Sequence, residues 1–157
     1  MTDPFGRLIS TLCEGNKVMP EHCVGGAPRF LNVIVGEVLP LLLRRYPIDP
    51  ERLGLFGISA GGFFASWAMF QPTSPFSKHL ICSPVLAYGD GEIFRSEARY
   101  VATDTDLRAR VYFGAGALER ADTLYEGMYQ IVSGMTRLDA ALRGRNYPMS
   151  SPSSTTG

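Results

Sequence analysis

The stretch that most constrains this chain is 53–70, LGLFGISAGGFFASWAMF. Its first half, LGLFGI, is apolar at successive positions, which is typical of a strand buried on both faces of a parallel sheet. Its second half, FFASWAMF, continues as an apolar helix with no proline before Pro72. Between them stands a short glycine-flanked segment, 57–61. The sequence therefore predicts a buried strand, a sharp turn and a buried helix, with Ser59 at the turn.

The turn has the spacing G-x-S-x-G, which suits a nucleophilic serine. A serine hydroxyl is a weak nucleophile and needs exposure, a nearby base and donors for the oxyanion. We expect Gly57 and Gly61 to let the strand and helix approach closely, because neither carries a Cβ. The backbone N–H of Ala60, at the start of the helix, is the expected oxyanion donor. The alternative is a glycine-rich turn with a bystander serine.

Composition limits the partners. The chain has 157 residues, 45% of them hydrophobic, and zero net charge, which fits one globular domain. The absence of a basic run argues against nucleic acid, and no apolar run is long enough to predict a membrane span. Cys13, Cys23 and Cys82 form no C-x-x-C motif. We therefore expect no metal, no cofactor and a reducing, cytoplasmic compartment.

The segments alternate between helix and strand. We expect an irregular segment over 1–27, a domain over 28–147 and a disordered tail over 148–157. Within the domain, the predicted helices cover 28–46, 60–70, 92–103 and 121–143, and the predicted strands cover 53–58, 78–83 and 108–115. This order predicts an α/β fold, a three-layer α/β/α sandwich with a parallel sheet. Ser59 and the loops 83–91 and 116–119 should then share the carboxyl edge, where ligands bind.

Several segments together resemble a known family of esterases within the α/β-hydrolase superfamily. The segments are GAPRFL at 26–31, RYPIDPER at 45–52, LFGISAGG at 55–62, SPVL at 83–86 and GAGALE at 114–119. They resemble the bacterial esterases related to the enterochelin, salmochelin and bacillibactin esterases. The resemblance implies hydrolysis of a small-molecule carboxylic ester, with siderophore-like esters as the candidate substrates, through an acyl-enzyme on Ser59. It implies no cofactor.

The resemblance also implies an acid and a histidine that follow the nucleophile along the chain. Glu119, after the third strand, is the expected acid, with Asp90 and Asp122 as alternatives. His79 begins its strand, which places it roughly 15 Å from the elbow and too far to act as the base. His22 precedes the first helix on the active edge and stays open as a substitute base. The sequence predicts no substrate-binding residues.

Two functions remain open on this evidence. The chain resembles the middle of a hydrolase domain, a truncated form without its first strands and without the histidine expected after the last helix. The first function is a serine esterase. The second is an inactive remnant, or interaction module, that keeps the elbow but not the base. In either case the open edge of the 53–58 strand predicts self-association.

Overall fold

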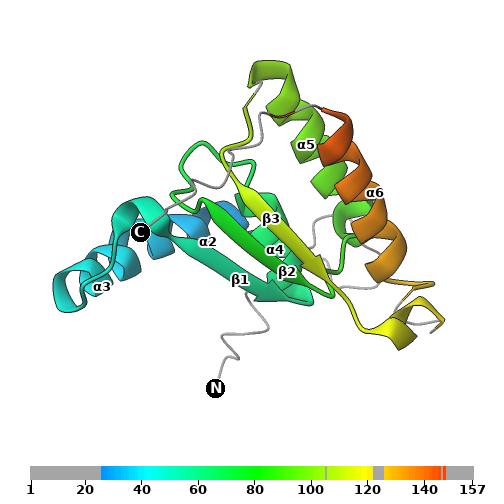
Figure 1. Ribbon diagram of the computed structural model, residues 1–157, viewed down its shortest axis with the longest axis horizontal. Coiled ribbons are helices and arrows are strands. Elements are labelled where there is room, and N and C mark those ends of the chain that lie inside the picture. Colours follow the sequence, from blue (N-terminus) through cyan, green and yellow to red (C-terminus); the bar gives the residue numbers. More distant parts are fainter. Residues whose placement is uncertain (1–25, 105, 122–125, 146, 148–157) are drawn as a thin grey trace, which may run out of the picture.

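The computed structural model describes residues 26–104, 106–121, 126–145 and 147. They contain one parallel sheet in the order β1–β2–β3, so that strands adjacent in sequence are adjacent in space (Figure 1). All three predicted strands are confirmed, each shorter than predicted by one to three residues. The strands are β1 (Gly54–Ile58), β2 (Lys78–Cys82) and β3 (Arg110–Gly114). The predictions for 1–25 and 148–157 lie outside the described residues.

Helices connect the strands, as the alternating pattern predicts. The helix predicted over 28–46 is present, with a π-helical stretch just before Pro40. There the N–H of Leu39 bonds to the carbonyl of Ile34, five residues back. This irregularity fits the missing N–H of Pro40, which cannot close the regular ladder. The helices are α2 (Ala27–Val33), η1 (Ile34–Val38), α3 (Leu39–Arg45), η2 (Pro50–Arg52), α4 (Ala60–Ala68), η3 (Tyr88–Asp90), α5 (Glu92–Thr103), η4 (Ala117–Arg120) and α6 (Ile131–Gly144).

The last helix begins later than the sequence predicts. Gln130, directly before α6, has a φ of 49° and interrupts any helix that comes before it. The Glu126 carboxylate accepts the N–H groups of Val132 at 2.9 Å and Ser133 at 3.0 Å. A carboxylate at this place satisfies the first free N–H groups and fixes where a helix starts. The prediction of helix through 126–130 is therefore wrong, and 122–125 lie outside the described residues.

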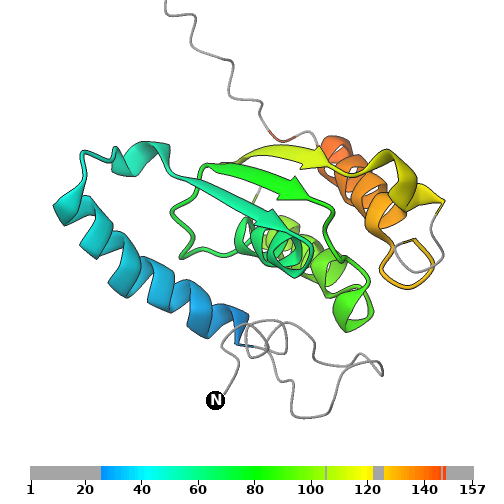
Figure 2. The ribbon, with the colours of Figure 1, turned by 90° about the horizontal axis from the view of Figure 1, so that it is seen from below.

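The described helices cover one face of the sheet. In Figure 2, α2 to α5 lie below the strands. Helix α4 contributes much of the core through Phe63, Phe64 and Trp67, and it contacts both β1 and β2. The Phe30 ring of α2 packs edge-on against Phe64, with ring centroids 5.1 Å apart. These contacts confirm an α/β fold with a parallel sheet.

The opposite face of the sheet is open. Phe56, Leu80 and Tyr112 are cross-strand neighbours on this face, and they are 61%, 42% and 64% exposed. Ile58 lies two residues beyond Phe56 and is also exposed. The apolar sequence of 53–58 predicts a strand that is buried on both faces. The described residues cover only one of these faces, so this prediction is wrong for the described part of the chain. The second helical layer of a three-layer sandwich is not found in the described part of the chain.

Strand β1 and helix α4 approach so closely that the turn between them requires glycine. A Cβ on Gly57 would lie 2.0 Å from the carbonyl oxygen of Gly61, and a Cβ on Gly62 would lie 2.9 Å from that of Cys82. A Cβ on Gly61 would meet nothing within 4 Å. The expectation that Gly61 lacks a side chain for close packing is therefore wrong. Its backbone is the group that Gly57 must avoid, whereas its own Cα faces open space.

His79 completes the end of helix α4. It is 2% exposed, and its Nδ1 lies 2.9 Å from the carbonyl oxygen of Ala65, while its Nε2 lies 3.2 Å from that of Phe76. The N–H of Met69, which would bond to Ala65 in a regular helix, bonds to Trp67 instead. The His79 ring therefore faces a carbonyl near the helix end, where carbonyl groups lose their regular partners. Burial lowers the pKa of His79 below 6.5, although both carbonyls act to raise it. The folded protein therefore favours the neutral ring.

The pKa of His79 predicts a loss of stability in mild acid. Below pH 6.5 the unfolded chain binds a proton at this ring that the folded chain does not, so the free energy of unfolding falls as the pH falls. Urea denaturation between about pH 7.5 and pH 5.5 should show this decrease. His79→Gln should be less stable at the higher pH and should show a flatter pH profile. If the free energy of unfolding changed with pH to the same extent in the wild type and in His79→Gln, the lowered pKa of His79 would be contradicted.

The glycines of the turn predict opposite effects of the same substitution. Gly57→Ala should destabilise the fold by more than about 4 kcal/mol, because the new Cβ overlaps a backbone oxygen that cannot move alone. Gly61→Ala should raise the free energy of unfolding by up to about 1 kcal/mol, since it adds helix propensity in open space. Circular dichroism during denaturation measures both effects. Equal stability of the two variants would show that the close approach is not required.

Candidate active site

Ser59 stands at the turn between β1 and α4 in a backbone conformation that non-glycine residues rarely adopt. Its φ is 56° and its ψ is −120°, and its side chain is exposed. Such a conformation costs about 1 to 3 kcal/mol and persists only where the surroundings impose it. Here the Ser59 N–H donates to the carbonyl of Cys82 at 3.1 Å, and its own carbonyl accepts from Phe63 at 3.1 Å and Val85 at 3.2 Å. The sheet, the helix and the following loop therefore all hold the serine in place.

The start of α4 offers donors beside this hydroxyl. The helix begins at Ala60, and no side chain caps its first N–H groups. The first N–H groups of any helix have no carbonyl partner within it, and they carry its partial positive charge. The Ser59 hydroxyl makes no hydrogen bond to any described residue. The Ser59 hydroxyl and these donors are therefore adjacent, and the catalytic roles of Ser59 and the Ala60 N–H stay predictions.

Glu119 lies at the same edge of the sheet, in η4 after β3. Its Oε2 accepts two hydrogen bonds, from the Ser83 hydroxyl at 2.9 Å and from the Gly116 N–H at 2.7 Å. The carboxylate is half-buried. Because β2 lies between β1 and β3, Ser83 occupies the edge between Ser59 and Glu119. The structure therefore places both predicted catalytic residues at the carboxyl edge of one sheet.

Ser83 lies at the candidate site, and the sequence analysis did not single it out. It follows β2 with a φ of 41°, and its N–H donates to the Gly114 carbonyl at 2.7 Å. Its hydroxyl bonds to a residue 36 positions further along the chain. The only local signal is a serine before a proline at a strand end, which is typical of many turns.

The other candidates are placed elsewhere. His79 lies at the amino end of β2, paired with Leu55, with both ring nitrogens facing carbonyl oxygens. It cannot reach Ser59, as the sequence predicts. Asp90 is exposed in η3, and its carbonyl accepts from Arg95 at 2.8 Å. His22 and Asp122 lie outside the described residues.

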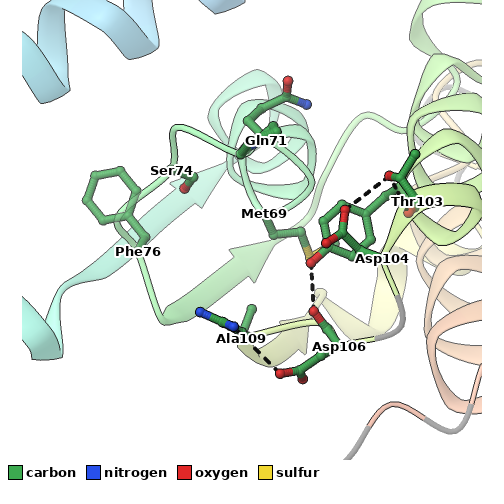
Figure 3. Close-up of a pocket in the computed structure, with 11 residues that line it drawn as sticks. Met69, Gln71, Ser74, Phe76, Thr103, Asp104, Asp106 and Ala109 are labelled. Carbon is green, nitrogen blue, oxygen red and sulfur yellow. Dashed lines mark hydrogen bonds and ion pairs between the residues drawn. The ribbon is translucent and has the colours of Figure 1, made fainter.

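A cavity of about 540 Å³ lies at the opposite edge from Ser59 (Figure 3). Phe76, which leads into β2, and Ala109, which leads into β3, help to line it. Two of its polar groups bond to each other, since the Tyr100 hydroxyl donates to the Asp106 carbonyl at 2.7 Å. In parallel sheets of this kind, ligands bind beyond the carboxyl ends of the strands. The cavity is therefore not the candidate active site.

Neither a metal-binding cluster nor a membrane-spanning helix is found in the described part of the chain. No group of three or more His, Cys, Asp or Glu side chains in it could hold a metal ion. None of its helices combines the length and the apolar character that a membrane span requires.

Comparisons with known sequences point to hydrolases. Residues 36–112 match the model of the prolyl oligopeptidase family. The "Ferri-bacillibactin esterase BesA" of Bacillus subtilis is 28% identical over 103 residues, which make up 64% of this chain and 35% of that protein. The "Siderophore enterobactin esterase" of Emericella nidulans is 35% identical over 104 residues, which make up 65% of this chain and 34% of that protein. The chain thus spans about a third of the length of these relatives.

Solved structures share the fold. The "BES protein from Bacillus cereus" superposes with a TM-score of 0.73 at 22% identity, covering 94% of this chain and 56% of that one. The "Siderophore hydrolase EstA from Aspergillus nidulans" superposes with a TM-score of 0.72 at 21% identity, covering 92% of this chain and 56% of that one. These comparisons confirm the resemblance stated from the sequence: this chain has an α/β-hydrolase fold, and over about two thirds of its length it is similar in sequence to two siderophore esterases.

Proposed function

We propose that this chain carries the nucleophile of a serine carboxylic ester hydrolase. The observation that carries the proposal is the exposed Ser59, held at φ 56° in front of α4. In the proposed reaction, Ser59 Oγ attacks the ester carbonyl carbon, and the Ala60 N–H helps to receive the negative charge on the carbonyl oxygen. The alcohol then leaves with a proton, an acyl-enzyme remains, and water hydrolyses it.

Glu119 is the proposed acid of this site. A carboxylate in this role accepts an imidazole N–H and stabilises the ring after it takes the serine proton. None of the described residues supplies a histidine at this edge, so the base must come from outside them. His22 is the candidate within the sequence.

The names of the relatives support a substrate class. Two relatives are named as esterases of bacillibactin and enterobactin. We therefore propose a siderophore-type carboxylic ester as the substrate. The unpaired Cys82 fits the proposed reducing, cytoplasmic compartment.

The nucleophile is tested with a fluorophosphonate probe and a p-nitrophenyl ester. Ser59 should become labelled, and the ester should turn over many times. Ser59→Ala should abolish labelling and lower turnover by at least about a thousandfold, because the catalytic groups act as a unit. His22→Ala should lower both if His22 is the base, and unchanged turnover would exclude that residue. Absence of labelling in protein that circular dichroism shows to be folded would overturn the proposed function.

An alternative of another class is favoured by the open sheet face. Phe56, Ile58 and Leu80 form an exposed apolar row beside the edge of β1 that pairs with no other strand in the described part of the chain. An exposed strand edge pairs readily with another chain, and two copies of the same edge can pair about a two-fold axis. We propose that, when the chain stands alone, a second copy pairs along the edge of β1 and covers the adjoining apolar residues of the open face. In this alternative the elbow remains as a structural turn and catalyses nothing.

The interaction surface is tested by one substitution on the face and one away from it. Phe56→Lys should shift the protein toward monomer in analytical ultracentrifugation, because a charge would be desolvated in the interface. Leu118→Lys is the matched control, since Leu118 is 85% exposed but lies in η4, outside the sheet. Equal self-association of both variants, or a monomeric wild type at all concentrations, would contradict the proposal.

A further inference from the structure

We propose that Ser83 is a positioning residue that fixes the Glu119 carboxylate at the carboxyl edge of the sheet. The inference rests on the proposed esterase function, which makes Glu119 the acid. It concerns a residue whose hydroxyl contacts the proposed acid and not the proposed nucleophile. Its role follows from three features of its surroundings.

The first feature is how the carboxylate is held. Oε2 of Glu119 accepts both the Ser83 hydroxyl at 2.9 Å and the Gly116 N–H at 2.7 Å. Oε1 accepts no hydrogen bond from any described residue. Hydrogen bonds to a charged acceptor are shorter and stronger than those between neutral groups. Oε2 is therefore anchored, whereas Oε1 has no donor among the described residues and could accept an imidazole N–H.

The second feature is the segment in which Ser83 lies. The Cys82 carbonyl accepts the N–H of Ser59, and the N–H of Val85 donates to the carbonyl of Ser59. The residues that flank Ser83 therefore hold the backbone of the proposed nucleophile, while the Ser83 hydroxyl holds the proposed acid. A displacement of this segment would move both groups together, which keeps their spacing constant.

The third feature is the backbone of Ser83 itself. Its φ of 41° is a conformation that glycine adopts without strain and that a side chain makes less favourable. The N–H of Ser83 is fixed by the Gly114 carbonyl at 2.7 Å, which ties the turn to the end of β3. Glycine would therefore satisfy the backbone at this position better than serine. The contribution of the serine is its hydroxyl.

Two substitutions separate the hydroxyl from the backbone. Ser83→Ala keeps the strained φ and removes the hydroxyl, whereas Ser83→Gly removes the hydroxyl and relieves the strain. If Ser83 positions Glu119, both variants should lower kcat by roughly tenfold with little change in KM, since a bond to a charged group is lost. If only the backbone matters, Ser83→Gly should match or exceed the wild-type rate, and that result would overturn the inference.

A second readout tests whether Ser83 acts through Glu119. Loss of an oriented carboxylate makes the imidazolium less stable, so the acid limb of the kcat/KM profile should move to lower pH in Ser83→Ala. In a Glu119→Gln background, Ser83→Ala should produce no further shift and no further loss of rate. An equal loss in both backgrounds would overturn the inference while leaving Ser59 as the nucleophile.

Failure of the proposed function is recognised separately. A folded wild type that the fluorophosphonate does not label would overturn the esterase function. The contact between Ser83 and Glu119 is then judged by denaturant midpoints of both single variants and the double variant. A double variant no less stable than the worse single variant would support the hydrogen bond as the anchor of Glu119. Additive shifts would overturn it.

Discussion

The structure depends on how closely strand β1 passes helix α4. Gly57 and the carbonyl of Gly61 are so near that a single added carbon would lie 2.0 Å from the oxygen. Because β1 ends at Ile58 and α4 begins at Ala60, the chain must change direction at the single residue Ser59. The rare φ of Ser59 follows from the approach, and the exposure of its hydroxyl follows from the reversal. The proposed chemistry is therefore a consequence of backbone packing.

The arrangement of the carboxyl edge also depends on backbone hydrogen bonds that continue beyond the ends of the strands. Ser59 bonds to Cys82, and Ser83 bonds to Gly114, so the pairing continues one residue past the ends of β1 and β2. These residues adopt positive φ angles there, which stops the ladder and turns the chain. The proposed nucleophile Ser59 and the residue that anchors Glu119, Ser83, therefore have the same local structure at the ends of neighbouring strands. The carboxyl edge becomes polar because the sheet ends in this way.

Much of this arrangement could be predicted from the sequence because it depends on local patterns. The three strands, the elbow and helices α4 and α5 follow from apolar runs and from the turn residues near them. The start of α6 was missed because Glu126 caps it from outside the helix, while the spacing of apolar residues continues through Gln130. The exposure of Phe56 was missed because an apolar run does not show which of its two faces is covered. The bond from Ser83 to Glu119 spans 36 positions and leaves no local trace.

Helix α4 is completed at both ends by strand β2. At its start, Gly62 packs against the carbonyl of Cys82, the last residue of the strand. At its end, the Ala65 carbonyl faces the ring of His79, near the first residue of the strand. Neither element can open without exposing the polar groups of the other. The amide hydrogens of α4 and β2 should therefore exchange with solvent in one cooperative opening, slower than those of the α3 surface helix.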